Sequence, residues 1–175
     1  VQSGVHRLIC IGTDARSSAR ALDFAKSHKN VFATIGIHPH DASLGRSELK
    51  KIAELPITSE LVAVGEIGLD YYYDNSPRST QRDMFEKQLD LARQRNLPVV
   101  SHVRDTKEAN GQVFDDFWPI VDNFPGIAGV LHSFTDNMVN LEKGLERGLY
   151  VGVNGIATFV KDRDEITLAI PDDRI

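Results

Sequence analysis

Short apolar runs recur along the chain, and segments with helical periodicity separate them. Several runs are continuous stretches of Val, Ile and Ala, which is typical of parallel strands covered on both faces. They predict six strands: Leu8–Ile11, Val31–Ile35, Leu61–Val64, Pro98–Val100, Ile127–Leu131 and Leu149–Val153. The intervening segments predict helices over Ser17–His28, Ser47–Leu55, Gln81–Arg95, Gly111–Asn123 and Asn137–Arg147.

Three helix-to-strand turns share one pattern, a cation followed by Asn or Gly. They are Lys29-Asn30-Val31, Arg95-Asn96-Leu97 and Arg147-Gly148-Leu149. Cations are favourable at a helix C-terminus, and Asn or Gly accepts the left-handed conformation that closes a helix. The regular alternation of strand and helix predicts right-handed crossovers and a parallel sheet.

Polar residues follow each predicted strand. These exits read Gly12-Thr13-Asp14, "GIHPHD" (36–41), Gly65-Glu66, "SHVR" (101–104), "HSF" (132–134) and Asn154-Gly155. In a parallel α/β fold the strand exits share one face, which is where sites form. A doubly wound sheet concentrates chemistry at one switch point, whereas here it is spread over at least four exits. The pattern therefore favours a TIM (β/α)8 barrel.

The predicted barrel is incomplete. A TIM barrel has eight strands and typically about 250 residues, and this sequence has 175 residues. We therefore expect one domain over residues 1–175, with strands missing at both ends. An apolar run at Ile170 would begin a further strand.

Composition excludes some classes of protein. The chain is 41% hydrophobic and 26% charged, and no apolar run approaches the ~20 residues of a membrane helix, so we expect no membrane contact. The single cysteine, Cys10, fits a reducing cytoplasm. A net charge of -5 argues against a module that holds nucleic acid by electrostatics alone. A nuclease remains possible because bound metal ions can contact phosphate directly.

Glu66, His102 and His132 each follow a different predicted strand, and together they predict a metal site. Imidazole with carboxylate suits Zn, Mn or Fe, and carboxylate with water suits Mg. A glutamate can bridge two divalent ions, which together hold an attacking water and a phosphoryl oxygen. We expect Gly65 and Gly68 to allow close backbone approach and to leave room for ions and substrate. The alternative is that Glu66 caps a helix and the histidines are hydrogen-bonded core residues.

Three further residues are candidates for substrate binding. His38 and His40 flank a proline, so the segment is either a metal-binding pair, a rigid loop that faces substrate, or structural; we interpret both histidines as facing substrate. Arg104 should point to the same side as His102, and its guanidinium suits phosphate. The alternative for Arg104 is an ion pair with Asp105 or Glu108. The three tyrosines at 71–73 can stack on bases or, as we prefer, pack the loop.

Four sequence motifs resemble those of one protein family. "GIHPHD" (36–41), "VGEIGLDYY" (64–72), "LPVVSHVRD" (97–105) and "LHSF" (131–134) are similar, in order and spacing, to the TatD family of metal-dependent deoxyribonucleases. The resemblance implies a TIM barrel of the metal-dependent hydrolase superfamily that cleaves phosphodiester bonds with two divalent ions, Mg, Mn or Zn. It implies that Glu66, His102 and His132 are metal ligands.

The sequence departs from the family at both ends. The family begins with a D-x-H-x-H strand and has a Glu-Thr-Asp-x-Pro strand near its end, and both carry further ligands. This sequence contains neither motif, so we expect it to cover about strands two to seven. The His38-Pro39-His40 segment is not the missing pair, because the family has both.

We therefore predict a cytoplasmic, metal-dependent hydrolase that cleaves DNA, with Glu66 as the catalytic carboxylate. Single-stranded DNA is the expected substrate, and the expected state is a monomer or a weak homo-oligomer. Two alternatives stay open. One is an esterase or deacylase on the same metal scaffold, acting on aminoacyl-tRNA. The other is an inactive, truncated fragment that binds metal or pairs with itself through exposed strand edges.

Overall fold

The computed structural model describes residues 4–106, 112–158 and 164–175. Strands and helices alternate along the chain, as the hydrophobic pattern predicts. The elements are β1 (Leu8–Cys10), α1 (Ala15–Ser27), β2 (Val31–Ile35), η1 (Pro39–Leu44), α2 (Gly45–Glu54), β3 (Leu61–Asp70), α3 (Arg78–Arg95), β4 (Val99–Arg104), α4 (Gln112–Asp122), β5 (Gly129–His132), α5 (Met138–Glu146), β6 (Tyr150–Val151), η2 (Gly155–Thr158) and α6 (Asp164–Leu168).

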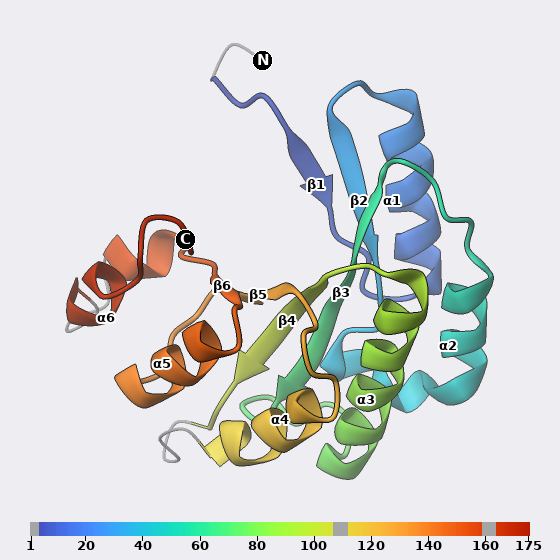
Figure 1. Cartoon of the computed structure of the whole chain (residues 1–175). Coiled ribbons are helices and arrows are strands. Elements are labelled where there is room, and N and C mark those ends of the chain that lie inside the picture. Colours follow the sequence, from blue (N-terminus) through green and yellow to red (C-terminus); the bar gives the residue numbers. More distant parts are fainter. Residues whose placement is uncertain (1–3, 107–111, 159–163) are drawn as a thin grey trace.

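The strands form one parallel sheet in the order β1-β2-β3-β4-β5-β6, so each strand pairs with its neighbours in sequence. The sheet curls, and helices α1 to α4 lie along its outer side (Figure 1). The predicted α/β fold with a parallel sheet is confirmed. Because all strands run in one direction, their carboxyl ends meet at a single edge of the sheet, and the candidate site lies there.

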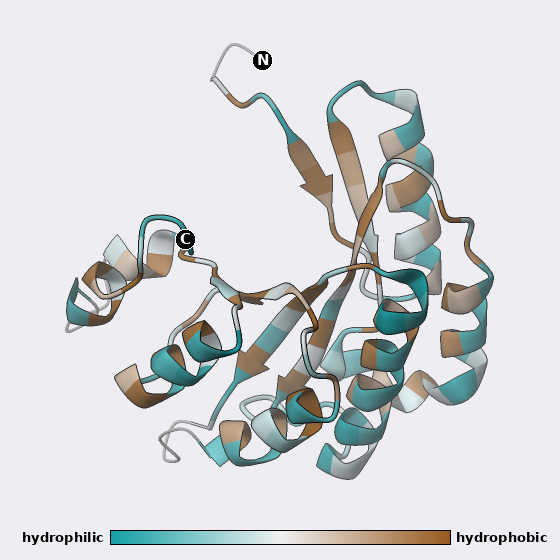
Figure 2. Ribbon diagram, viewed as in Figure 1, coloured by the Kyte–Doolittle hydropathy of each residue, from teal (hydrophilic) through white to brown (hydrophobic). Residues whose placement is uncertain are grey.

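The core lies between the strands and the helices that cover them. Hydrophobic residues fill the strands, and the helices turn their hydrophilic faces outward (Figure 2). In α3, the predicted apolar stripe is buried, with Phe85 1% exposed and Leu89 fully buried. The Phe85 ring stacks on that of Phe117 in α4 at a centroid distance of 5.1 Å. The aromatic contact thus joins two consecutive helices of the outer layer.

The first helix begins at Ala15, two residues before the predicted start at Ser17. Asp14 is the N-cap of α1, and its carboxylate accepts a hydrogen bond of 2.6 Å from the backbone N–H of Ser17. Glu48 in α2 accepts from the backbone N–H of Ala15 at 2.9 Å and from Lys51 Nζ at 2.9 Å. The bonds from Lys51 and Ala15 lower the pKa of the Glu48 carboxyl. Glu48 therefore joins the start of α1 to α2.

The three predicted helix-to-strand turns adopt left-handed conformations. Asn30, Asn96 and Gly148 have φ angles of 64°, 52° and 75°. Asn96 is the C-cap of α3, and its N–H donates to the carbonyls of Ala92 and Arg93. Asn and Gly at these turns therefore adopt the left-handed conformation that the sequence predicts.

Several boundaries differ from the prediction. Strand β3 continues past Val64 to Asp70, and β4 continues to Arg104, because polar residues extend the same ladder: Gly68 pairs with His102 and Asp70 with Arg104. Elements η1, η2 and α6 were not predicted. The predicted helix start at residue 111 lies outside the described residues. Ile170 does not begin a strand; it packs against Leu141 and Val151.

No helix in the described part of the chain combines the length and the apolar character needed to cross a membrane.

Candidate metal centre

A cavity of about 660 Å³ lies at the carboxyl ends of the central strands. It brings together every candidate site residue that the sequence indicates. These residues come from the segment after β2 and from β3, β4 and β5. The lining consists of His38, His40, Glu66, Asp70, Tyr73, His102, Val103, Arg104, His132, Ser133, Thr135 and Ile156.

Glu66 enters the cavity from a bulge in β3. Gly65 pairs with Val100 and Ile67 pairs with Ser101, so Glu66 has no partner residue in β4. The N–H of Glu66 instead donates to the carbonyl of Gly12 at 3.1 Å. A bulge interrupts the alternation of side chains and redirects the extra residue. Glu66 therefore lies inside a strand, and the alternative that it caps a helix is wrong.

The glycines beside Glu66 face the neighbouring strand. A Cβ atom on Gly65 would lie 2.5 Å from Cβ of Val100, and one on Gly68 would lie 2.0 Å from the carbonyl oxygen of His102. Gly68 also has a φ of 138°, a conformation that side chains rarely adopt. The expected close backbone approach is confirmed. The interpretation that these glycines leave room for ions and substrate is wrong, because β4 occupies that space.

His102 lies between two carboxylates. Its Nδ1 is 2.9 Å from Glu66 Oε1, and its Nε2 is 2.8 Å from Asp70 Oδ2. Burial acts to lower the pKa of His102, but the hydrogen bonds to Asp70 and Glu66 outweigh it and raise the pKa to about 9. Burial likewise acts to raise the pKa of Glu66, and the bond with His102 reverses this, so that the pKa is lowered. Without metal and at neutral pH, the protonated imidazole of His102 donates one N–H to Glu66 and the other to Asp70.

Asp70 is a site residue that the sequence analysis missed. Its side chain is fully buried. Oδ2 contacts His102 Nε2 and lies 3.0 Å from His40 Nε2, while Oδ1 accepts from the N–H groups of Tyr72 at 3.0 Å and Tyr73 at 2.9 Å. Burial acts to raise the pKa of Asp70, but these hydrogen bonds hold it far below its usual range. A signal was present in the sequence, since Asp70 follows Glu66 by an even spacing in the same motif.

His38 belongs to the group of potential ligands. Ligand atoms of His38, Glu66 and His102 all lie within 4.8 Å of one another. His38 Nε2 is 4.0 Å from Glu66 Oε1, and its ring centroid is 4.6 Å from that of His102. Burial, and then the charge of His102, lower the pKa of His38 to about 4. A neutral imidazole beside an ionised carboxylate is a donor set that suits a divalent ion.

His40 is held away from this group. Its Nε2 bonds to Asp70, and its side chain is 29% exposed at the cavity wall. Pro39 begins η1 directly after His38, so the segment is a rigid turn, which was one of the alternatives from sequence. The two imidazole rings remain in edge contact, with centroids 4.4 Å apart, but they face different carboxylates: His38 faces Glu66 and His40 faces Asp70.

His132 and Arg104 complete the wall of the cavity. His132 is the last residue of β5, and its partner on the neighbouring strand β4 is His102. Its Nε2 lies 3.9 Å from Glu66 Oε1, and its side chain is 49% exposed. Arg104 lines the same cavity as His102, as predicted from their spacing. Its guanidinium carbon lies 4.2 Å from the ring centre of Tyr72 and 5.0 Å from that of Tyr73.

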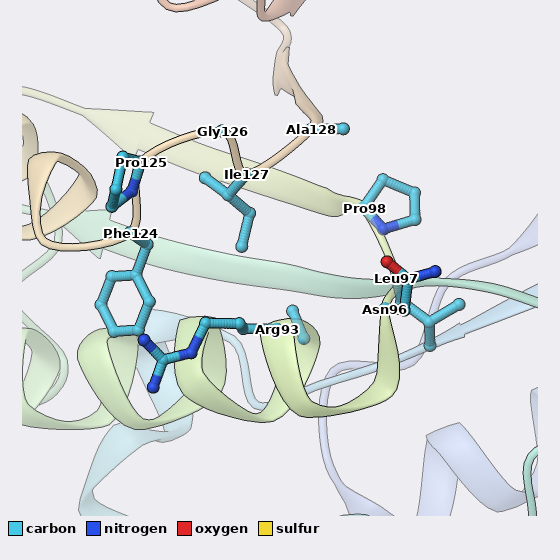
Figure 3. A pocket seen from close by; sticks show the side chains of 10 residues that line it. Arg93, Asn96, Leu97, Pro98, Phe124, Pro125, Gly126, Ile127 and Ala128 are labelled. Carbon is cyan, nitrogen blue, oxygen red and sulfur yellow. The ribbon is translucent and has the colours of Figure 1, made fainter.

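A second cavity, of about 390 Å³, lies at the opposite end of β4 and β5. Arg93, Asn96 and Pro98 line it from the α3–β4 turn, and Phe124 and Ile127 line it from the turn before β5 (Figure 3). These residues precede the strands, whereas the candidate site residues lie at the strands' carboxyl ends. The second cavity is therefore separate from the metal centre.

The curled parallel sheet brings imidazole and carboxylate groups together at its carboxyl ends, and these groups form a donor set that can hold a divalent metal ion. Comparison with known families gives the particular family. The family model described as "TatD related DNase" matches residues 1–175. The chain belongs to this family, as the four motifs indicate.

Relatives and solved structures agree with this assignment. The chain is 31% identical to the metal-dependent hydrolase YabD of Bacillus subtilis, over 98% of this chain and 66% of the relative. It is 36% identical to the 3'-5' ssDNA/RNA exonuclease TatD of Citrobacter rodentium, over 87% of this chain and 57% of the relative. The chain thus spans less than two thirds of the length of these relatives.

The solved structure of YjjV, a TatD homologue from Escherichia coli, matches with a TM-score of 0.84 and 27% identity, over 97% of this chain and 65% of that one. A TatD family hydrolase from Entamoeba histolytica shares the fold, with a TM-score of 0.80 over 99% of this chain and 60% of that one. In this chain, His38, Glu66 and His102 form a group whose ligand atoms could hold a metal ion.

Proposed function

We propose that this chain carries the metal centre of a TatD-like hydrolase that cleaves phosphodiester bonds of DNA. One observation carries the proposal: the Glu66 carboxylate leaves its strand at a bulge and meets the imidazole groups of three other segments. The names of the relatives, which include single-stranded DNA and RNA exonucleases, support a nucleic acid as substrate.

Glu66, His102 and His132 are the proposed ligands, and the geometry adds His38 to them. We propose that these residues would hold two divalent ions, drawn from Mg, Mn and Zn. When bound, such ions would supply Lewis acidity and a water of lowered pKa. Asp70 orients His102 by accepting from its Nε2, which leaves Nδ1 directed at Glu66 and the centre of the cavity. A carboxylate on the far nitrogen of a metal-binding histidine fixes its tautomer.

Arg104 and Tyr73 are the proposed contacts for the nucleic acid strand, and His38 and His40 are the further groups that can face it. The Arg104 guanidinium suits a phosphate oxygen of the substrate. Tyr73 is 53% exposed at the edge of the cavity, with its ring 5.3 Å from that of His40. An exposed aromatic ring beside an arginine can stack on a base without selecting its identity. These features favour single-stranded over double-stranded substrates, because only unpaired bases offer their faces.

We further propose that residues 1–175 form one incomplete barrel domain, whose strands correspond to about strands two to seven of a TIM (β/α)8 barrel. The structural match to YjjV over 65% of that chain supports this correspondence. The single cysteine, Cys10, supports a reducing compartment such as the cytoplasm. We expect a monomer or a weak homo-oligomer.

The test is hydrolysis of single-stranded DNA by the wild type and by Glu66→Gln, in Mg²⁺, Mn²⁺ and Zn²⁺. We expect the variant to lose activity, whereas a matched control, Glu54→Gln, at an exposed position on α2, keeps it. Activity of Glu66→Gln at the wild-type level would refute the proposal. Faster turnover of aminoacyl-tRNA than of DNA would favour the deacylase alternative.

A further inference from the structure

Helix α3 carries two buried glutamines that contact the backbone of strand ends. Gln81 and Gln88 are each 1% exposed, and they lie about two helical turns apart, so they share one face of the helix. Neither residue is in the wall of the metal cavity. Buried amides need hydrogen-bond partners, and both side chains find theirs close to the candidate ligands.

Gln88 clamps the residue that precedes His38. Its Oε1 accepts from the N–H of Ile37 at 2.6 Å, and its Nε2 donates to the carbonyl of Ile37 at 3.0 Å. Ile37 is 1% exposed, so water could not replace this pair of bonds at low cost. These two hydrogen bonds fix the position of Ile37 and the planes of its two peptide groups. They thereby set the direction in which the side chain of His38 projects.

Gln81 clamps Asp70 in the same way. Its Oε1 accepts from the N–H of Asp70 at 2.8 Å, and its Nε2 donates to the carbonyl of Asp70 at 3.0 Å and to that of Ser76 at 2.8 Å. The Ser76 hydroxyl in turn donates to the carbonyl of His40 at 2.8 Å. Asp70 and His40 are also joined directly, because His40 Nε2 bonds to Asp70 Oδ2 at 3.0 Å.

We propose that Gln81 and Gln88 are positioning residues for the metal centre. Helix α3 acts as a rigid element of fixed length, and the two amides fix the Asp70 carboxylate and the His38-Pro39-His40 turn relative to each other. An amide suits this task because it offers both a donor group and an acceptor group to the backbone yet carries no charge that would attract the ion. The inference rests on the proposed function only in that these histidines surround a metal.

The test compares Gln81→Met and Gln88→Met, which keep side-chain length but remove the hydrogen bonds, with two controls on the same helix. Leu89→Ala removes a fully buried apolar side chain and destabilises the core without touching a strand-end peptide. Gln94→Met changes an exposed glutamine that contacts Asp90. The readouts are Mn²⁺ affinity by calorimetry, the visible spectrum of bound Co²⁺, and hydrogen exchange of the Ile37 and Asp70 amides in metal-free protein.

We expect each Gln→Met variant to bind Mn²⁺ about 10- to 100-fold more weakly and to exchange its clamped amide faster, with an altered Co²⁺ spectrum. Both controls should keep the affinity and spectrum of the wild type. Gln88→Glu, which burial keeps protonated, can still accept from the Ile37 N–H and donate to the Ile37 carbonyl, so it should lose less affinity than Gln88→Met, and it serves if the latter does not fold.

Wild-type Mn²⁺ affinity and an unchanged Co²⁺ spectrum in both Gln→Met variants, at a loss of stability equal to that of Leu89→Ala, would overturn the proposal. The glutamines would then serve only as hydrogen-bond partners for buried backbone groups. Weakened metal binding in a protein whose wild type does not cleave DNA would uphold the positioning role and refute the proposed function instead.

Discussion

Replacing Asp70 by asparagine should change which nitrogen of His102 carries a proton. Asp70 accepts four hydrogen bonds, two from backbone N–H groups at Oδ1 and two from imidazole nitrogens at Oδ2. Asparagine has one oxygen acceptor and one amino group. The backbone N–H groups can only donate, so the oxygen must stay with them and the amino group must face His40 and His102. In the neutral form of His102, which is the form that binds metal, Nε2 then has to accept, so the proton lies on Nδ1.

This tautomer is the wrong one for metal binding, because Nδ1 is the nitrogen that lies 2.9 Å from Glu66 Oε1. Losing the carboxylate partner of a metal-binding histidine typically weakens metal affinity by about 10- to 100-fold, which is about 1.4 to 2.8 kcal/mol. The metal-free protein should also lose about 1.5 to 3 kcal/mol of stability, since a hydrogen bond to a charged group disappears from a buried site.

The assay is calorimetric titration of Mn²⁺ into wild type and Asp70→Asn, with urea unfolding of the metal-free proteins. A matched control is Asp116→Asn, which changes a carboxylate that accepts from the Tyr71 hydroxyl at 2.6 Å outside the cavity. The control should keep the wild-type affinity. If Asp70→Asn also bound Mn²⁺ with wild-type affinity, the argument from the tautomer would be refuted.

Three further outcomes are expected. Gly68→Ala should destabilise the protein by more than about 3 kcal/mol in urea unfolding, since it adds backbone strain to a clash with β4. Gly148→Ala, with open space around it, should cost only about 1–2 kcal/mol. Equal losses of stability in the two variants would contradict the packing argument. Tyr73→Ala should weaken binding of single-stranded DNA by about 1–3 kcal/mol in fluorescence anisotropy, and Tyr150→Ala, another exposed tyrosine, should not. Because the pKa of Glu48 is lowered in the folded protein, the folded protein binds fewer protons at this residue than the unfolded chain does. The stability that Glu48 contributes is therefore fully present above its unfolded pKa of about 4.5. It is lost as the pH falls through the lower folded pKa. The stability difference between wild type and Glu48→Gln in urea should therefore shrink between pH 6 and pH 3, and a constant difference would refute the assignment.

The order of elements and the face of the site could be predicted from sequence because local signals carry them. Continuous Val and Ile runs gave the strands, and β2 has the predicted bounds of Val31–Ile35. Cations and Asn or Gly marked the turns. The strand exits then placed Glu66, His102 and His132 on one face, and the structure brings them to one cavity.

The rest depended on contacts between distant segments. Polar residues end an apolar run in the sequence, so β3 was expected to stop at Val64, but pairing with β4 carries it on to Asp70. The bulge at Glu66 is a mismatch in register between two strands, which no single segment encodes. The clamps of Gln81 and Gln88 join residues far apart in sequence, and helical periodicity shows only that their face is buried.

The strictly consecutive order of the strands has a consequence for how the chain is made. Among the six strands that the structure describes, each new strand pairs with the one synthesised just before it, so none of these pairings waits for a segment far downstream. Glu66 and the three imidazoles around it come from four successive strand ends, between His38 and His132. All of these side chains therefore precede β6 in the chain, so their assembly needs no pairing with a strand that is synthesised later than β5.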